Sequence, residues 1–287
     1  MRMLTVNKMA QGAPTISIVT PSLNQGRFLS ETIESVIGQR GNFSIDYTIM
    51  DGGSTDNSID IIRGYNDRLH AGAYPLECQH VNMRWVSEPD LGPGDAVNKG
   101  FRSATGAIVA FINSDDLYEQ GALQHVLNRF AENPDVEIIY GHGLSVSEEN
   151  IIEDLYPTKD VNVNSLLDRC WICQPALFMR MKTWLAAGEF RTDLIAFDYE
   201  YWLRLKKRGL IFHFTDRVLA RTRMHADTKR RLHHRAIVLE CLELTRTKFG
   251  YNRIWLKHYL LELTIPGRFI KHLIKFMLRR ASAMRER

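Results

Sequence analysis

Short apolar runs alternate with helical periodicity through the first part of the chain. Four runs have the length and composition of buried strands, at residues 16–20, 47–50, 84–87 and 107–112. Between them, apolar residues recur at helical spacing within 28–37 and from residue 59 onward, and a further helix is predicted over 95–102. The alternation predicts βαβ units and therefore a mostly parallel sheet flanked by helices.

Acidic residues or turn residues follow each of these predicted strands. Pro21 follows the first, Asp51 the second, Glu88 the third, and Asp115 with Asp116 the fourth. Right-handed crossovers bring the carboxyl ends of parallel strands to one edge of the sheet, where open α/β sheets bind their ligands. We therefore expect these residues to converge although they are far apart in the sequence.

The adjacent carboxylates of Asp115 and Asp116 are the clearest chemical feature of this edge. Neighbouring carboxylates repel each other unless a cation or hydrogen bonds hold them, and oxygen ligands of this kind suit Mg²⁺ or Mn²⁺. The alternative is that one of them caps a helix beginning near Tyr118. The pair alone leaves both interpretations open.

Neither a dinucleotide fingerprint nor a lysine-containing phosphate loop follows any of the predicted strands. A diphosphate bound here would therefore need a metal ion to balance its charge. A metal next to a diphosphate is the chemistry of a nucleotide-sugar site.

A set of motifs in this order resembles family 2 inverting glycosyltransferases, which have the GT-A fold. The motifs are TPSLN at 20–24, DGGSTD at 51–56, SEPD at 87–90, DAVNKG at 95–100, NSDD at 113–116 and DYEYWLRL at 198–205. The resemblance covers roughly residues 15 to 228 and implies an α/β fold of GT-A type. This fold has a Rossmann-like, mixed but mostly parallel sheet flanked by helices, and here it would be followed by a helical C-terminal extension.

The resemblance also implies roles for single residues. Pro21 and Asp51 would contact the base, Asp95 the nucleoside region, and Asp115 the metal. Asn113 stands where the family's Asp-x-Asp motif has its first aspartate, so Asp116 is a second candidate metal ligand and His225 a third. The full set of expected donor-binding residues is Thr20, Pro21, Asn24, Asp51, Glu88, Asp95, Asn98, Lys99, Asn113 and Ser114.

The resemblance assigns the acceptor and the general base to the second part of the chain. Trp171 and Gln174 combine an aromatic face with an amide, as sugar-binding surfaces do, and are the expected acceptor-binding residues. Asp198 matches the family's general base, with Glu200 as the alternate. Position alone would make Asp198 a helix N-cap.

The expected organisation has four parts. Residues 1–14 form a flexible N-terminus, 15–117 the nucleotide-sugar half, 118–232 the acceptor-binding and catalytic half of the same domain, and 233–287 a helical extension. The extension ends in a basic amphipathic tail.

Charge is concentrated in that tail. Residues 268–287 carry seven Lys and Arg and one acid, a net charge of +6, whereas the whole chain carries +4, so the first 267 residues carry −2. This distribution argues against a nucleic-acid partner and favours peripheral contact with an anionic membrane. The alternative is a helix packed on the enzyme's own core or on a second subunit. Without a signal peptide or a membrane span, the expected location is the cytoplasm, at the inner face of the plasma membrane.

The sequence therefore predicts a metal-dependent enzyme that uses Mn²⁺ or Mg²⁺. It would transfer one sugar, with inversion, from a nucleotide-diphosphate sugar, with UDP favoured, to a hydroxyl of a glycan or lipid-linked acceptor. The expected pathway is bacterial surface polysaccharide biosynthesis, and the absence of a Gln-x-x-Arg-Trp motif favours single transfer over polymerisation. The alternatives are a sugar-nucleotide pyrophosphorylase, whose glycine- and arginine-rich first loop is missing from 20–28, and a catalytically inactive carbohydrate-binding scaffold.

Overall fold

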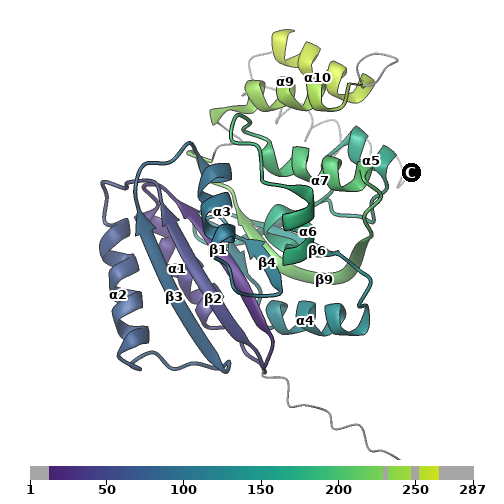
Figure 1. Ribbon diagram of the computed structural model, residues 1–287. Helices are drawn as coiled ribbons and strands as arrows, with labels where there is room; N and C mark the ends of the chain where they lie inside the picture. Colours follow the sequence, from purple (N-terminus) through teal and green to yellow (C-terminus); the bar gives the residue numbers. More distant parts are fainter. Residues whose placement is uncertain (1–12, 229–231, 247–251, 265–287) are drawn as a thin grey trace, which may run out of the picture.

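The computed structural model of the chain describes residues 13–228, 232–246 and 252–264 (Figure 1). The predicted basic tail at 268–287 lies outside the described residues, as does nearly all of the predicted flexible N-terminus.

The first half of the chain forms the parallel part of the sheet. Its strands pair in the order β3-β2-β1-β4, and every pair is parallel. The strands are β1 (Thr15–Ser22), β2 (Ser44–Asp51), β3 (His80–Ser87) and β4 (Ile108–Phe111), and the crossovers contain α1 (Gly26–Ile37), α2 (Ser58–His70) and α3 (Pro93–Arg102). Strand alternation sends Ile16 and Ile18 to the core that α1 lines, and Val19 to the opposite core beneath α3.

The second half adds strands of mixed direction to the same sheet. Its described strands continue the order as β8-β6-β9-β5, with β7 paired to β6 alone. The strands are β5 (Leu117–Tyr118), β6 (Ile138–Val146), β7 (Ile152–Leu155), β8 (Leu177–Arg180) and β9 (Phe212–Arg223). The helices are α4 (Ala122–Glu132), α5 (Val163–Asp168), the 3₁₀ helix η1 (Gln174–Ala176), α6 (Met181–Ala187) and α7 (Phe197–Lys207). The predicted mixed sheet flanked by helices is confirmed.

The antiparallel pairing of β5 with β9 matters most for the site. Leu117 pairs with Arg221, so the residues just before β5 lie beside the residues just after β9. The structure has this strand where the capping alternative placed a helix near Tyr118, and the next helix begins only at Ala122. Capping of such a helix by Asp115 or Asp116 is therefore wrong.

The described C-terminal residues form two helices, α9 (His234–Leu244) and α10 (Arg253–Thr264), as the prediction of a helical extension required. Figure 1 shows them stacked beyond α7, away from the parallel strands. The Glu240 carboxylate of α9 accepts the backbone N–H groups of Ile195 and Ala196, just before α7. In the described part of the chain, no helix is both long and apolar enough to cross a bilayer.

Candidate functional site

Asp51 ends β2 and organises the turn that follows it. Its buried carboxylate accepts the backbone N–H groups of Gly53 at 3.0 Å and Ser54 at 2.8 Å, and the hydroxyl of Ser87 at 2.7 Å. These three bonds all reach Oδ2, whereas Oδ1 accepts the Ser54 hydroxyl. A carboxylate oxygen has two lone pairs, so Oδ1 retains one acceptor position.

The loop after β1 is held to this turn. Asn24 adopts a left-handed backbone conformation with φ of 52°, and its Oδ1 accepts the N–H of Thr55 at 2.8 Å. Asp56 accepts the N–H of Gly26, the first residue of α1, at 2.9 Å. A Cβ at Gly26 would lie 1.9 Å from Asn57 Oδ1, so a larger residue here would require the Asn57 side chain to move. The loops after β1 and β2 thus form one hydrogen-bonded unit.

Three predicted donor residues lie in the protein interior. Pro21 is buried within β1, paired with Met50. The Thr20 hydroxyl shares a hydrogen bond of 3.0 Å with Tyr47, and both amide atoms of Asn98 bond to the backbone of Phe190 at 2.9 Å. Thr20 and Asn98 therefore tie the sheet and α3 to their surroundings.

Three other predicted donor residues meet in one ion-pair cluster beside the turn. Lys99 of α3 lies 3.1 Å from Glu88 and 3.3 Å from Asp95. Asp95 also accepts the N–H of Leu91 at 3.2 Å. The convergence of these residues at the carboxyl edge of the sheet is what the parallel arrangement predicts.

The segment from Asn113 to Asp116 follows β4 at the same edge. Asp116 is buried, and its carboxylate accepts the N–H of Arg223 at 3.0 Å and the amide of Asn113 at 3.1 Å. Burial, together with the negative charge of Asp115, raises the pKa of Asp116 to about 8. Ser114 is also buried. Asp116 is thus enclosed by protein donors, whereas Asp115 is partly exposed.

Asp115, just before β5, meets His225, just after the paired strand β9. The distance from Asp115 Oδ2 to His225 Nε2 is 2.9 Å, and the imidazole is buried, with its ring 4.7 Å from the Phe28 ring. His225 Nδ1 is buried and has no hydrogen-bond partner among the described residues. No cluster of three or more His, Cys, Asp or Glu side chains suited to a metal ion occurs in the described ranges, so this site offers a pair of ligands.

The start of α7 separates the two candidate bases. Ala196 is the N-cap, so Asp198 is the second residue of the helix and the expectation of an N-cap at 198 is wrong by two residues. The rings of Phe197 and Phe111 are 5.8 Å apart, which places this helix end beside the end of β4. Asp198 and Glu200 are two residues apart and therefore project from nearly opposite sides of the helix.

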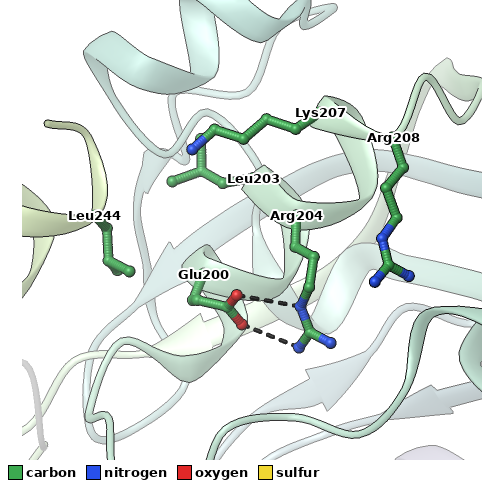
Figure 2. Close-up of a pocket in the computed structure, with 6 residues that line it drawn as sticks. All are labelled: Glu200, Leu203, Arg204, Lys207, Arg208 and Leu244. Carbon is green, nitrogen blue, oxygen red and sulfur yellow. Dashed lines mark hydrogen bonds and ion pairs between the residues drawn. The ribbon is translucent and has the colours of Figure 1, made fainter. Parts of the chain in front are cut away.

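Glu200 is bound by its own helix. Its two carboxylate oxygens accept the Arg204 guanidinium at 3.1 and 3.0 Å, in a hollow of about 320 Å³ between α7 and Leu244 of α9 (Figure 2). Arg204 also donates to the backbone carbonyls of Ala187 and Glu189. Glu200 is thus part of a structural junction between α6 and α7.

The predicted acceptor residues have different surroundings. Gln174 donates to the Phe111 carbonyl at 2.8 Å and accepts the Asn113 amide at 3.1 Å, so it contacts the segment that carries Asp115. Trp171 donates its indole N–H to Ser165, and the cations of Lys159 and Arg169 lie 4.0 and 5.0 Å from its ring centroid.

Arg223 is the residue that sequence reasoning missed. It contacts Asp115 and Asp116 and is buried, but an arginine at the end of a strand gave no sign of burial. The one usable signal was its spacing of two from His225, which in extended chain puts both side chains on one side.

The family model described as glycosyl transferase family 2 matches residues 17–185, more than half of the chain. The chain belongs to glycosyl transferase family 2. The family that the sequence motifs indicated is thereby confirmed. The matched range includes the turn at Asp51 and the segment at Asp115 but ends before Asp198 and His225.

Two curated relatives illustrate the family. An uncharacterised glycosyltransferase of Nostoc sp. is 32% identical over 135 residues, which are 47% of this chain and 38% of the relative. The chondroitin synthase of Escherichia coli is 24% identical over 202 residues, which are 70% of this chain and 28% of that protein. The chain thus spans about a third of the length of these relatives.

Solved structures share the fold. TarS of S. aureus, residues 1–349 in complex with UDP-GlcNAc, has a TM-score of 0.60 at 16% identity, covering 79% of this chain and 66% of that one. The mannosyltransferase PcManGT of Pyrobaculum calidifontis, in complex with GDP-Man and Mn²⁺, has a TM-score of 0.58 at 16% identity, covering 88% and 70%. The predicted GT-A fold is confirmed.

Proposed function

We propose that this chain transfers one sugar, with inversion, from a nucleotide-diphosphate sugar to an acceptor hydroxyl. Family membership and the shared fold support glycosyl transfer, and the UDP-GlcNAc bound to TarS supports a UDP-sugar donor. The observation that carries the proposal is the pairing of Asp115 with His225 at the carboxyl edge of the sheet.

The pair fits a divalent cation. Asp115 Oδ2 and His225 Nε2 are 2.9 Å apart, so a carboxylate oxygen and an imidazole nitrogen, both ligand types for divalent cations, lie side by side. Carboxylate suits Mg²⁺ and Mn²⁺, and an added imidazole favours Mn²⁺. Asp115 and His225 would be the residues of this chain that hold the ion. When bound, such an ion would act as a Lewis acid on the leaving diphosphate.

Asp116, next to Asp115, has a structural role in this proposal. Because its carboxylate is enclosed by the Arg223 N–H and the Asn113 amide, we assign it to fixing the turn that presents Asp115, rather than to direct ligation.

The donor base and ribose would lie over the turns after β1, β2 and β3. The remaining acceptor position on Asp51 Oδ1 would receive a base N–H; Asn24 is bonded to the turn after Asp51, and Pro21 pairs with Met50, the residue before it. The cluster of Glu88, Asp95 and Lys99 lies next to it and is proposed to contact the nucleoside. Thr20 and Asn98 would support these contacts from the interior.

Asp198 is the proposed general base. A base must be ionised and within reach of the acceptor hydroxyl. The first turn of α7 favours its ionised form, because the helix dipole is positive there. Both oxygens of Glu200 are bound by the Arg204 guanidinium, which assigns Glu200 to the junction between α6 and α7.

The acceptor would approach from the side of Gln174 and Trp171. A glycan or lipid-linked acceptor, a role in surface polysaccharide biosynthesis and peripheral contact with the inner face of the plasma membrane through the basic tail all remain part of this proposal. The tail itself lies outside the described residues.

Thermal unfolding in the presence of nucleotide sugars tests the proposal. A ligand at 100 times its Kd stabilises the folded state by about 2.7 kcal/mol. We expect UDP-sugars with Mn²⁺ to raise the Tm of the wild type, and His225→Gln to lose the part of the rise that depends on Mn²⁺. Failure of every nucleoside diphosphate and nucleotide sugar to raise the Tm would contradict the proposed function.

A further inference from the structure

Arg223 is a charged side chain that is fully buried, with 0% of its surface exposed. Burying a guanidinium is costly unless its charge is balanced and its N–H groups are bonded. Arg223 is the last residue of β9 and lies two residues before His225. Its backbone N–H donates to Asp116, so its burial affects the candidate site.

The guanidinium binds three different segments. Its Nε donates to the backbone carbonyl of Asp115 at 3.0 Å, one terminal nitrogen donates to the carbonyl of Glu148 in the β6–β7 turn, and the other lies 2.9 Å from the carboxylate of Glu31 in α1. Arginine can do this because its planar fork carries five N–H groups in fixed directions. Arg223 therefore links the Asp115 backbone to the β6–β7 turn and to α1.

Arg223 also reaches His225, through a shared aromatic ring. The Arg223 Cζ lies 4.8 Å from the centre of the Phe28 ring, and the His225 ring lies 4.7 Å from the same centre. The two side chains project to one side because they are two residues apart in extended chain. The backbone N–H of Arg223 also donates to the Asp116 carboxylate.

We propose that Arg223 is a positioning residue, with Glu31 as its counterion, that sets the placement of Asp115 relative to His225. It touches neither ligand atom but holds the Asp115 backbone directly and shares Phe28 with His225. Outer contacts of this kind change metal affinity by about 10- to 100-fold when they are lost. The functional part of this inference rests on the proposed metal-dependent function.

Arg221 provides a matched control. It lies two residues earlier on the same strand and pairs with Glu119 and Asn150 instead of the Asp115 segment. Arg223→Lys keeps the charge but cannot donate in three fixed directions, and Arg221→Lys makes the same change outside the site. Glu31→Gln is a milder variant, because the Glu31 side chain is 48% exposed and its loss should leave the fold intact.

Two measurements on the full chain test the proposal. The first is hydrogen exchange of the Asp116 amide, which donates to Asn113 at 3.1 Å, in protein without added metal. The second is Mn²⁺ affinity, from the electron paramagnetic resonance of free Mn²⁺ in the absence of nucleotide. We expect exchange to be about tenfold faster in Arg223→Lys and somewhat faster in Glu31→Gln, and the Kd for Mn²⁺ to rise about tenfold or more in Arg223→Lys. Arg221→Lys should change neither.

The two readouts separate this inference from the proposed function. Unchanged exchange in both Arg223→Lys and Glu31→Gln, or equal acceleration in Arg221→Lys, would overturn the positioning role. A wild type that binds no Mn²⁺ would contradict the proposed metal site, and exchange alone would then decide the role of Arg223. If Arg223→Lys does not fold, Glu31→Gln decides by the same two measurements.

Discussion

Strand β2 carries two buried aspartates, one near each end of the strand. Different groups balance the charges of their carboxylates. Asp46, near the amino edge, accepts the Ser17 hydroxyl at 2.8 Å and both the N–H and hydroxyl of Thr105 at 2.9 Å, and it pairs with the Arg84 guanidinium. Asp51, at the carboxyl edge, accepts only neutral N–H and hydroxyl groups of neighbouring turns among its described partners.

Asp116 extends the same contrast. Burial alone would raise the pKa of Asp46, but the hydrogen bonds from Thr105 and Ser17 and the charge of Arg84 outweigh it and lower that pKa. Burial and the charge of Asp115 instead raise the pKa of Asp116 to about 8. At the amino edge a guanidinium within the protein therefore balances Asp46, whereas at the carboxyl edge Asp116 is bonded to the uncharged Arg223 N–H and Asn113 amide, and an added cation would favour its ionised form. Acids at the first edge should matter for stability, and acids at the second for binding and turnover.

The largest effect should come from the proposed base beside the carboxyl edge. Asp198→Asn keeps the size of the side chain but cannot accept a proton, so we expect turnover to fall by about 10²-fold or more, with donor affinity and Tm near those of the wild type. Steady-state kinetics with a competent acceptor measures this. Glu200→Gln is the matched control and should retain turnover. The reverse result, with Glu200→Gln inactive and Asp198→Asn active, would assign the base to Glu200.

A smaller effect, on stability alone, should follow a change at the amino edge. Asp46→Asn removes the charge that Arg84 and Thr105 bind, and we expect it to lower the free energy of unfolding by about 2 kcal/mol. Urea unfolding measures this, with turnover per folded molecule unchanged. Asp60→Asn, which removes an exposed pair with Arg63, should change stability by less than about 0.5 kcal/mol. A loss of turnover in Asp46→Asn beyond its loss of folded protein would break the comparison.

The smallest effect is the pH dependence of that stability. Because the pKa of Asp46 in the folded state is lowered from its ordinary value of 3.8, its contribution is fully present above that value and is lost as the pH falls through the lowered pKa. The difference in unfolding free energy between wild type and Asp46→Asn should therefore begin to shrink near pH 4 and go on shrinking as the pH falls further. A difference that stays constant over this range would mean that ionisation of Asp46 does not stabilise the fold.

The sequence predicted the parallel half well because its apolar runs are local signals. The strand ends at Asp51, Glu88 and Asp115 follow from period and turn chemistry, and right-handed crossovers then bring them to one edge. Contacts between distant segments were not predictable in this way. Three such contacts join segments that are far apart in the chain. Asn98 bonds to the Phe190 backbone, Arg84 pairs with Asp46, and Arg223 is buried against the Asp115 segment.

The assignment of Asp198 over Glu200 shows the same limit. Both acids lie in the first turn of α7, and only the family resemblance favoured Asp198 before the structure was known. The structure adds that Arg204 binds both oxygens of Glu200. Residues four apart on a helix can form such a pair, but their spacing does not require it.

Calorimetric titration of UDP, with and without Mn²⁺, tests the central claim that Asp115 and His225 hold a metal at the carboxyl edge. We predict that Mn²⁺ strengthens UDP binding in the wild type and has no effect in Asp115→Ala, whose affinity for UDP without metal stays unchanged. Asp51→Ala is the complementary control and should weaken UDP binding whether or not Mn²⁺ is present. An equal enhancement by Mn²⁺ in Asp115→Ala and in the wild type would contradict the account.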